Sequence, residues 1–359
     1  MLYRESGQYK TSYISDQSIF PIREDRIGIA IIGVIAIVIP FVASDFFLNA
    51  IMTPFLILAL AAIGLNILTG YAGQLSLGTG AFMGVGAYSC YKLTTIFPDV
   101  NIIILVLLSG LFSAGIGVIF GLPSLRIKGL YLAVTTLAAQ FFLEWCFIRI
   151  PWLYNYNSSG AIEVPERRGF GDIILTGPAA GAMTQYFVVL GIVVVVTLAV
   201  KNIVRGRIGR QWMMIRDMDI AAELMGVRPL TAKLSAFAVS SYLCGVAGAM
   251  FIFFYLGAAE PSAFSITLSF QILFMVILGG LGSLVGSYFG AAFIWGLPIV
   301  LRAVLPAMGI DIGAETVFHI ATMVVGALII FFLIVEPHGL ARLWSLGKEK
   351  LRVWPFPYG

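Results

Sequence analysis

The sequence predicts an all-α fold of the membrane class, a polytopic bundle of about ten transmembrane helices. Two observations on composition support this prediction: 60% of the 359 residues are hydrophobic, and only 11% are charged. Soluble domains have about 25% charged residues, so this chain lacks the groups that solvate a globular surface. The third observation is that several apolar stretches are long enough to cross a bilayer as a helix, which takes about 20 residues.

The apolar stretches follow one another along the chain, separated by short turns or by longer polar segments. The polar leader before the first stretch is long for a cleavable signal, so we expect an uncleaved first helix. The third stretch is rich in glycine and could be partly broken or re-entrant. The ten expected helices span residues 27–44, 50–68, 75–96, 102–122, 130–148, 185–201, 232–256, 265–281, 285–304 and 317–335.

The polar segments divide the chain into a membrane domain with two tails. The domain covers residues 27–335 and is flanked by an N-terminal tail, 1–26, and a C-terminal tail, 336–359. Two long polar segments interrupt it, 151–183 and 202–230. The first is large enough to dock a partner, or to cap the bundle.

The distribution of Lys and Arg predicts the orientation. If the N-terminus is cytoplasmic, the cytoplasmic Lys and Arg residues are four in each of the two tails, two between the fourth and fifth helices, and seven from position 201 to position 233. This places 17 of the 22 on the cytoplasmic side. Cytoplasmic loops favour Lys and Arg. We therefore expect both termini and segment 202–230 inside, and segment 151–183 outside.

Side chains that bind metals or perform catalysis do not cluster in the sequence. Cys90, Cys146 and Cys244 lie far apart in apolar stretches, where small packing residues are expected. His319 and His338 are also far apart. The phosphate-loop pattern of nucleotide-binding proteins is absent. We expect no metal, no cofactor in this chain, no enzymatic site and no nucleic-acid partner.

The first motif is TGYAGQLSLGTGAFMGVGAY at residues 69–88, with six glycines among twenty residues. Small residues let helices approach closely in lipid. The same glycines permit a helix break, which is tolerated at membrane depth only inside protein or beside water. Gln74, Ser76 and Thr79 are its polar candidates for lining a pathway. Close packing alone and pathway lining both remain open.

The second motif is GRIGRQWMMIRDMDIAAELMGVRPLTAK at residues 206–233. Asp217 and Asp219 favour the start of a short helix, and Gly226 with Pro229 favours its end. An apolar knob in a basic cytoplasmic loop suits docking into a groove on a partner. An ordinary loop folded on the bundle is the alternative. The docking candidates are Ile220, Ala221, Ala222, Leu224, Met225 and Gly226.

Two further features concern the membrane helices. The stretch GGLGSLVGSYFGAA at residues 279–292 is rich in small residues and is expected to pack two helices tightly. The fifth helix carries Thr135 and Thr136, which we add as pathway candidates, and Glu144 near its outer end. Intramembrane carboxylates are candidates for function, although this position is nearly interfacial.

At these motifs the chain resembles the LivM family of branched-chain amino-acid ABC transporter permeases. The resemblance rests on residues 69–88, on LRIKGLYLAVTTLA at 125–138, on the loop 202–230, and on VILGGLGSLVGSYFGAAF at 276–293. It implies a permease in the bacterial inner membrane that imports a small polar solute. Relatives of this family handle branched-chain and other amino acids, urea, amides and aromatic acids, and the resemblance favours an amino acid. It also implies a LivH-like second permease, two ATPase subunits that bind ATP, and a periplasmic solute-binding protein.

The resemblance also implies a coupling helix in the cytoplasmic loop. Ala221, Ala222 and Gly226 match the EAA-x-x-x-G spacing of ABC importer permeases, where this loop meets the ATPase. Ile220 stands in place of the leading Glu, which removes the side chain for a salt bridge there. An ion-coupled secondary transporter is the alternative function. Such proteins often use midplane carboxylates, and only Glu144 competes for that role.

Overall fold

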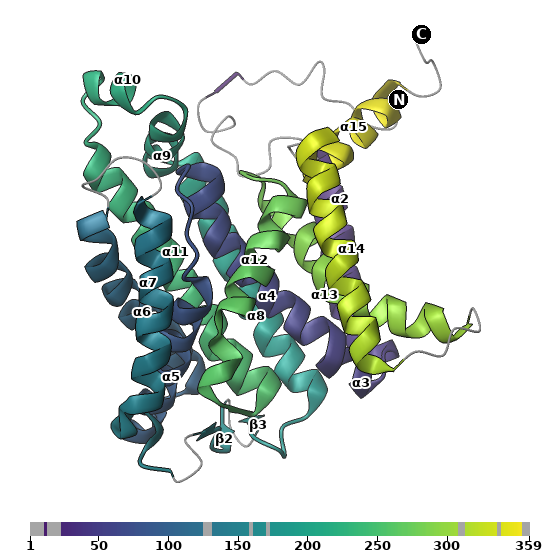
Figure 1. Ribbon diagram of the computed structural model, residues 1–359. Coiled ribbons are helices and arrows are strands. Elements are labelled where there is room, and N and C mark those ends of the chain that lie inside the picture. Colours follow the sequence, from purple (N-terminus) through teal and green to yellow (C-terminus); the bar gives the residue numbers. More distant parts are fainter. Residues whose placement is uncertain are drawn as a thin grey trace.

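The chain folds into a bundle of long helices (Figure 1). The computed structural model describes residues 11–12, 23–124, 131–157, 161–169, 173–307, 313–335 and 339–353. Its α-helices are α2 (Arg23–Val42), α3 (Asp45–Phe47), α4 (Thr53–Asn66), α5 (Thr79–Ile96), α6 (Ile102–Ser124), α7 (Tyr131–Arg149), α8 (Ala182–Arg205), α9 (Arg207–Asp217), α10 (Asp219–Leu224), α11 (Pro229–Phe251), α12 (Ile266–Gly279), α13 (Leu284–Ala307), α14 (Ala314–Val335) and α15 (Gly339–Val353).

Short helical turns and strands complete the described chain. The π-helical turns η1 (Leu48–Met52), η2 (Ile67–Tyr71) and η4 (Ile252–Leu256) extend α4 and α11, and the 3₁₀ turns are η3 (Pro151–Tyr154) and η5 (Pro261–Phe264). The strands are β1 (Ile162–Glu163), β2 (Arg167–Arg168), β3 (Ile174–Thr176) and β4 (Ala258–Ala259). β1 pairs with β4 and β2 with β3, both antiparallel.

The prediction of a polytopic helical membrane protein is confirmed. Seven helices in the described chain are long and apolar enough to cross a bilayer. Two shorter apolar helical stretches, Arg26–Val42 and Thr322–Phe332, lie in α2 and α14. Helices suit this composition because a helix satisfies its own backbone hydrogen bonds where lipid offers none. A helix occupies each of the ten expected stretches, and the count of ten crossings stays a prediction.

The centre of the bundle is formed by α4 and α11, and α5 packs on α11. In each of the two central spans, Asp45–Tyr71 and Pro229–Leu256, 83% of the most apolar window is buried, against 28–50% in the other five. A methyl group on Gly248 would lie 1.9 Å from the Met83 carbonyl oxygen, and one on Gly86 would lie 2.0 Å from that of Gly245. The backbones of α5 and α11 therefore touch, as expected for small residues in lipid.

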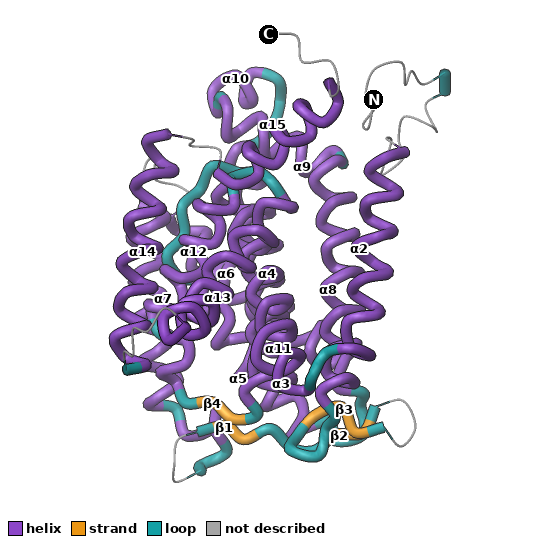
Figure 2. The backbone as a smooth tube through the Cα atoms, turned by 90° about the vertical axis from the view of Figure 1, so that its right-hand side faces the viewer, coloured by secondary structure: helices purple, strands orange, loops and turns teal. Residues whose placement is uncertain are grey.

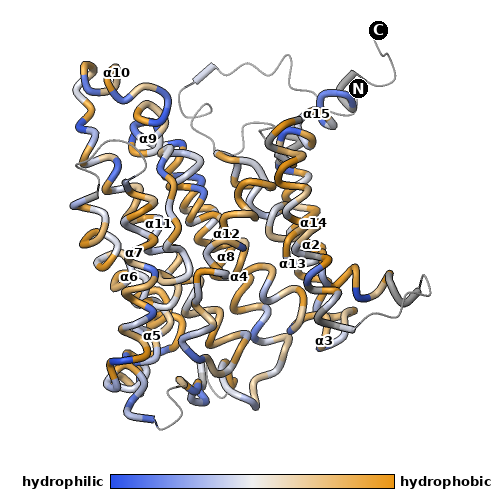
Figure 3. The backbone as a smooth tube through the Cα atoms, in the orientation of Figure 1, coloured by the Kyte–Doolittle hydropathy of each residue, from blue (hydrophilic) through white to orange (hydrophobic). Residues whose placement is uncertain are grey.

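The two ends of the bundle are polar, and its middle is apolar (Figure 3). The four strands gather at one end, while α9, α10 and α15 lie at the other (Figures 1 and 2). We refer to these as the strand end and the α10 end. The α10 end is the one that the Lys and Arg distribution predicts to be cytoplasmic.

The structure adds elements that the sequence did not predict. Residues 202–230 hold α9 as well as the expected short helix, the C-terminal tail contains α15, and segment 151–183 contributes three strands. The strands are two or three residues long, too short for a pattern of alternation to reveal them. Three predicted features lie partly or wholly outside the described residues: most of the tail 1–26, the motif residues 125–130, and positions 158–160 and 170–172 of segment 151–183.

Candidate functional site

A break in helical structure at residues 72–78 is the first part of the candidate site. The helical stretch that contains α4 ends with η2 at Tyr71, and α5 begins only at Thr79. Between them the chain forms a loop, which starts near the α10 end and continues between the helices of the bundle (Figures 1 and 2). The third expected helix, 75–96, is therefore shorter than predicted, and the glycine-rich break that the sequence allowed is present. Gly73, with φ of 67°, occupies a conformation that other residues rarely adopt.

Polar side chains from two other helices satisfy the backbone where the break meets α5. The Leu77 N–H donates to Thr136 Oγ1 on α7 at 3.0 Å. The Gly80 N–H donates to Ser269 Oγ on α12 at 2.7 Å, and the Ala81 N–H donates to Gln140 Oε1 on α7 at 2.8 Å. The first N–H groups of a helix have no partner within it, and lipid supplies none. These three side chains therefore hold the start of α5 in place.

Gln140 is the centre of this network, and sequence reasoning did not select it. Its Oε1 also accepts from Ser269 Oγ at 2.9 Å, and its Nε2 donates to the Phe264 carbonyl at 2.7 Å. The side chain is fully buried. The signal in the sequence is an amide within an apolar helix, which must find partners when buried. Its partners lie 59, 124 and 129 positions away, which no local pattern indicates.

The pathway candidates lie at or near the break in different surroundings. Thr136 is buried and supports the backbone of Leu77. The Thr135 hydroxyl donates to the Tyr131 carbonyl of its own helix. Thr79, also buried, begins α5, and Ser76 is buried with its Oγ accepting the Gly78 N–H at 3.4 Å. The structure thus places four of the five predicted residues at the break or against it.

Gln74 differs from the other polar residues of the break. Only 8% of its surface is exposed, and within the described chain neither Nε2 nor Oε1 has a hydrogen-bond partner. Its backbone N–H is satisfied by the Leu68 carbonyl at 2.9 Å. An unpaired buried polar group costs about 1–3 kcal/mol. An amide held in this state is explained when a ligand, water or a partner chain completes its hydrogen bonds.

A second set of contacts ties the α4 end of the break to the glycine turn at residues 280–283. Asn66, fully buried in α4, donates from Nδ2 to the Ser283 carbonyl and to Ser287 Oγ, both at 2.9 Å. Its Oδ1 accepts the Gly282 N–H at 2.9 Å. Gly280 and Gly282 both have positive φ, as a tight turn requires. One asparagine therefore ties the end of α4, just before the first glycine-rich motif, to the second glycine-rich motif.

The predicted short helix is present as α10, at the end of the bundle that carries α9 and α15 (Figure 1). Gly226 ends it with φ of 85°, the left-handed conformation common at helix C-termini. Ile220, Leu224 and Met225 are 65%, 86% and 65% exposed, whereas Ala222 is fully buried. The helix thus presents apolar side chains outward from a buried base. Exposed apolar groups in a polar region mark interaction sites.

The preceding helix, α9, anchors α10 to the bundle. Trp212 is fully buried and donates from Nε1 to Ser235 Oγ on α11 at 2.9 Å. Arg216, in the last turn, donates from Nη1 to the Gly70 carbonyl at 2.8 Å. Only Met218 separates the end of α9 from the start of α10. The exposed helix is therefore linked through α9 to the chain just before the break.

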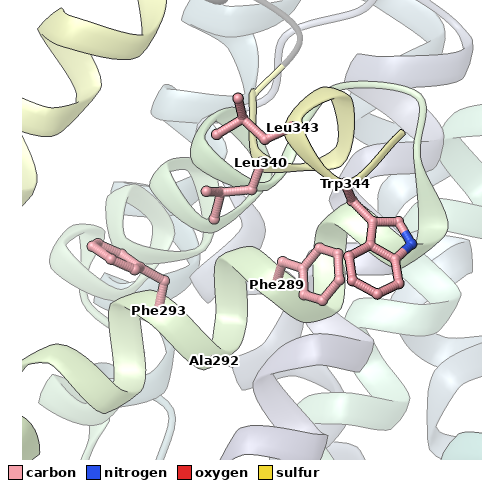
Figure 4. A pocket seen from close by; sticks show the side chains of 6 residues that line it. All are labelled: Phe289, Ala292, Phe293, Leu340, Leu343 and Trp344. Carbon is pink, nitrogen blue, oxygen red and sulfur yellow. The ribbon is translucent and has the colours of Figure 1, made fainter. Parts of the chain in front are cut away.

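A shallow, wide-open apolar cavity of about 560 Å³ lies elsewhere, between α13 and α15. Phe289, Ala292 and Phe293 of α13 face Leu340, Leu343 and Trp344 of α15 across it (Figure 4). The rings of Phe289 and Trp344 are 5.7 Å apart. These six side chains offer no group that pairs with a charged solute, so the cavity is not part of the candidate site.

Known proteins resemble this chain in sequence along most of its length. A family model described as the permease component of the branched-chain amino acid transport system matches residues 47–333. The high-affinity branched-chain amino acid transport system permease protein LivM of Salmonella typhimurium is 29% identical over 329 residues, covering 86% of this chain and 72% of the relative. The protein of that name from Escherichia coli is 28% identical with the same coverage. No solved structure matches the chain.

Proposed function

This chain belongs to the family of branched-chain amino acid transport permease components, and on that premise we propose that it is the membrane-spanning subunit of an ABC importer for branched-chain or related amino acids. The observation that carries the proposal is the family match over residues 47–333, which encloses the break, the glycine turn and α10. The described spans support a multi-pass membrane location. The bacterial inner membrane, with both termini in the cytoplasm, is the location and orientation that we propose.

The break at residues 72–78 is the proposed border of the solute pathway. Non-helical backbone inside a membrane bundle offers polar groups that regular helices hide. The Gln74 amide has two N–H donors and one acceptor, so it can pair with both the carboxylate and the ammonium of an amino acid. Ser76 and Thr79 lie on the same segment, with Thr135 and Thr136 on the neighbouring α7.

The helix α10 is the proposed docking element for an ATPase subunit. Its exposed Ile220, Leu224 and Met225 suit an apolar groove. Ala221, Ala222 and Gly226 keep the spacing of the family's coupling loop. The proposed partners are a LivH-like second permease, two ATPase subunits that bind the ATP, and a periplasmic solute-binding protein.

Reconstitution of the purified complex tests this function. The complex is placed in proteoliposomes with ATP inside and the solute-binding protein outside, and uptake of radiolabelled leucine, isoleucine, valine and other amino acids is measured. We expect uptake that requires ATP and the binding protein and that is insensitive to proton and sodium ionophores. Uptake without ATP, driven by an imposed ion gradient, would show a secondary transporter and refute the proposal.

A further inference from the structure

Arg216 contacts both glycine-rich segments that flank the candidate site. Its Nη1 donates to the Gly70 carbonyl at 2.8 Å, and a methyl group on Gly282 would lie 3.4 Å from the same nitrogen. A methyl group on Gly73 would lie 2.9 Å from Arg216 Cγ. The stem of the arginine therefore lies on Gly73, at the start of the break, while its guanidinium reaches Gly70 and the 280–283 turn.

The Gly70 carbonyl needs a donor from outside its own helix. The last four carbonyl groups of a helix lack a partner within it, and η2 ends at Tyr71, one residue after Gly70. The backbone N–H of Gln74, which a continuing α-helix would direct to Gly70, bonds to Leu68 instead. A cation at this position also interacts favourably with the negative end of the helix dipole. Arg216 thus caps the helix where the break begins.

The guanidinium is held by a second partner on the same helix. Arg216 Nε lies 2.9 Å from Asp217 Oδ1, while Nη1 is bonded to Gly70. A planar guanidinium can hold two acceptors in fixed directions, which the single ammonium of a lysine does not reproduce. Asp217 is the last residue of α9, and α10 begins two positions later. Arg216 therefore connects the base of α10 to the helix end beside Gln74.

We propose that Arg216 is a positioning residue that transmits movement of α10 to the break and so couples ATPase activity to passage of the solute. Displacement of α10 moves the base of α9, and Arg216 passes that displacement to Gly70, four residues before Gln74. The Asn66 bonds to Gly282 and Ser283 carry the same movement to the turn between α12 and α13. This inference rests on the proposed function, because it needs an ATPase seated on α10.

Replacement of the arginine in the reconstituted complex tests the inference. Arg216→Gln removes the charge and the forked guanidinium. We expect this complex to assemble and to keep its basal ATPase activity. The ratio of solute transported to ATP hydrolysed should fall about tenfold or more. The size of this expected loss follows from one hydrogen bond of a charged group, which is made in one conformational state and absent in the other. Arg216→Lys, which keeps the charge but not the fork, is expected to retain an intermediate ratio.

Arg210→Gln is the matched control, because Arg210 is exposed on the same helix and the substitution changes charge equally. It should leave the ratio of transport to ATP hydrolysis at the wild-type value. A wild-type ratio in an assembled Arg216→Gln complex would overturn the inference. So would an Arg210→Gln variant with a loss equal to that of Arg216→Gln, since general charge would then be the cause.

Asp217→Asn decides the matter if Arg216→Gln fails to assemble. Asp217 is exposed, and its loss frees the guanidinium without removing it. We expect a twofold to threefold lower transport ratio with assembly intact, a modest loss because the ion pair is exposed to solvent. An unchanged ratio there, together with a wild-type ratio in Arg216→Lys, would overturn the inference. If the wild-type complex itself shows no ATP-dependent uptake, the proposed function fails, independently of Arg216.

Discussion

Replacement of Gln140 by leucine should destabilise the membrane domain by roughly 2–5 kcal/mol. The amide makes three hydrogen bonds, to the Ala81 N–H, the Ser269 hydroxyl and the Phe264 carbonyl, and it is fully buried. Interhelical hydrogen bonds in membrane proteins are worth about 0.6 kcal/mol on average and about 1.7 at most. Three such bonds give the stated range. Leucine has a similar size, so a cavity adds little to the loss.

The assay for Gln140→Leu is unfolding of the purified protein in mixed micelles with increasing SDS, followed by tryptophan fluorescence and circular dichroism. Gln271→Leu on α12 is the matched control, because Gln271 is half-buried and takes no part in this network. We expect a clear shift of the Gln140→Leu midpoint to lower SDS and a near-normal midpoint for the control. Unfolding of Gln140→Leu at the wild-type midpoint would refute the account of how the start of α5 is held.

Three further predictions address the pathway, the docking helix and the orientation. Gln74→Leu removes two unpaired buried atoms, so it should keep or raise stability while lowering uptake about tenfold, as measured by thermal unfolding and proteoliposome transport. Normal uptake with normal assembly would remove Gln74 from the pathway. Leu224→Asp should express and fold normally because the side chain is exposed, but bind the ATPase poorly in pull-down assays; Gly226→Val should share this defect because its φ is positive. In a cysteine-free background, a cysteine at Ser262 should react with impermeant maleimide from outside and one at Ser345 only from inside, and the reverse pattern would invert the proposed orientation.

The helical membrane class could be predicted because it depends on composition and on the length of apolar runs. Both are properties of single segments, and lipid allows few folds for such segments. The helix α10 was predictable for a similar reason: Asp219 at its start and Gly226 after its end act locally. The helices α9 and α15 were missed because their apolar residues line one face of otherwise polar segments, which a search for long apolar runs overlooks.

The hydrogen-bond partners of the buried polar groups could not be predicted from the sequence. An amide at position 140 or 66 within an apolar stretch indicates that a hydrogen-bond partner is needed, but not which one. Ala81, Phe264 and Ser269 meet Gln140 only once α5, α7 and α12 have packed. The glycine-rich stretch at residues 69–88 is limited in the same way, because the sequence does not decide between close helix packing and a break in the helix. The structure has both, with Gly86 packed on α11 and residues 72–78 non-helical.

The sequence by itself determined three things about this chain: that it forms membrane helices, that a break is permitted at the glycine-rich stretch, and that the basic loop contains a short helix ended by a glycine. Those properties follow from hydrophobicity, glycine content and capping, which act within a few residues. Only the tertiary structure decided that the break is held by Gln140 and Ser269, and that Arg216 reaches Gly70 from 146 positions away. The physical reason is that a hydrogen bond is made at about 3 Å, and packing of distant helices alone brings such groups that close.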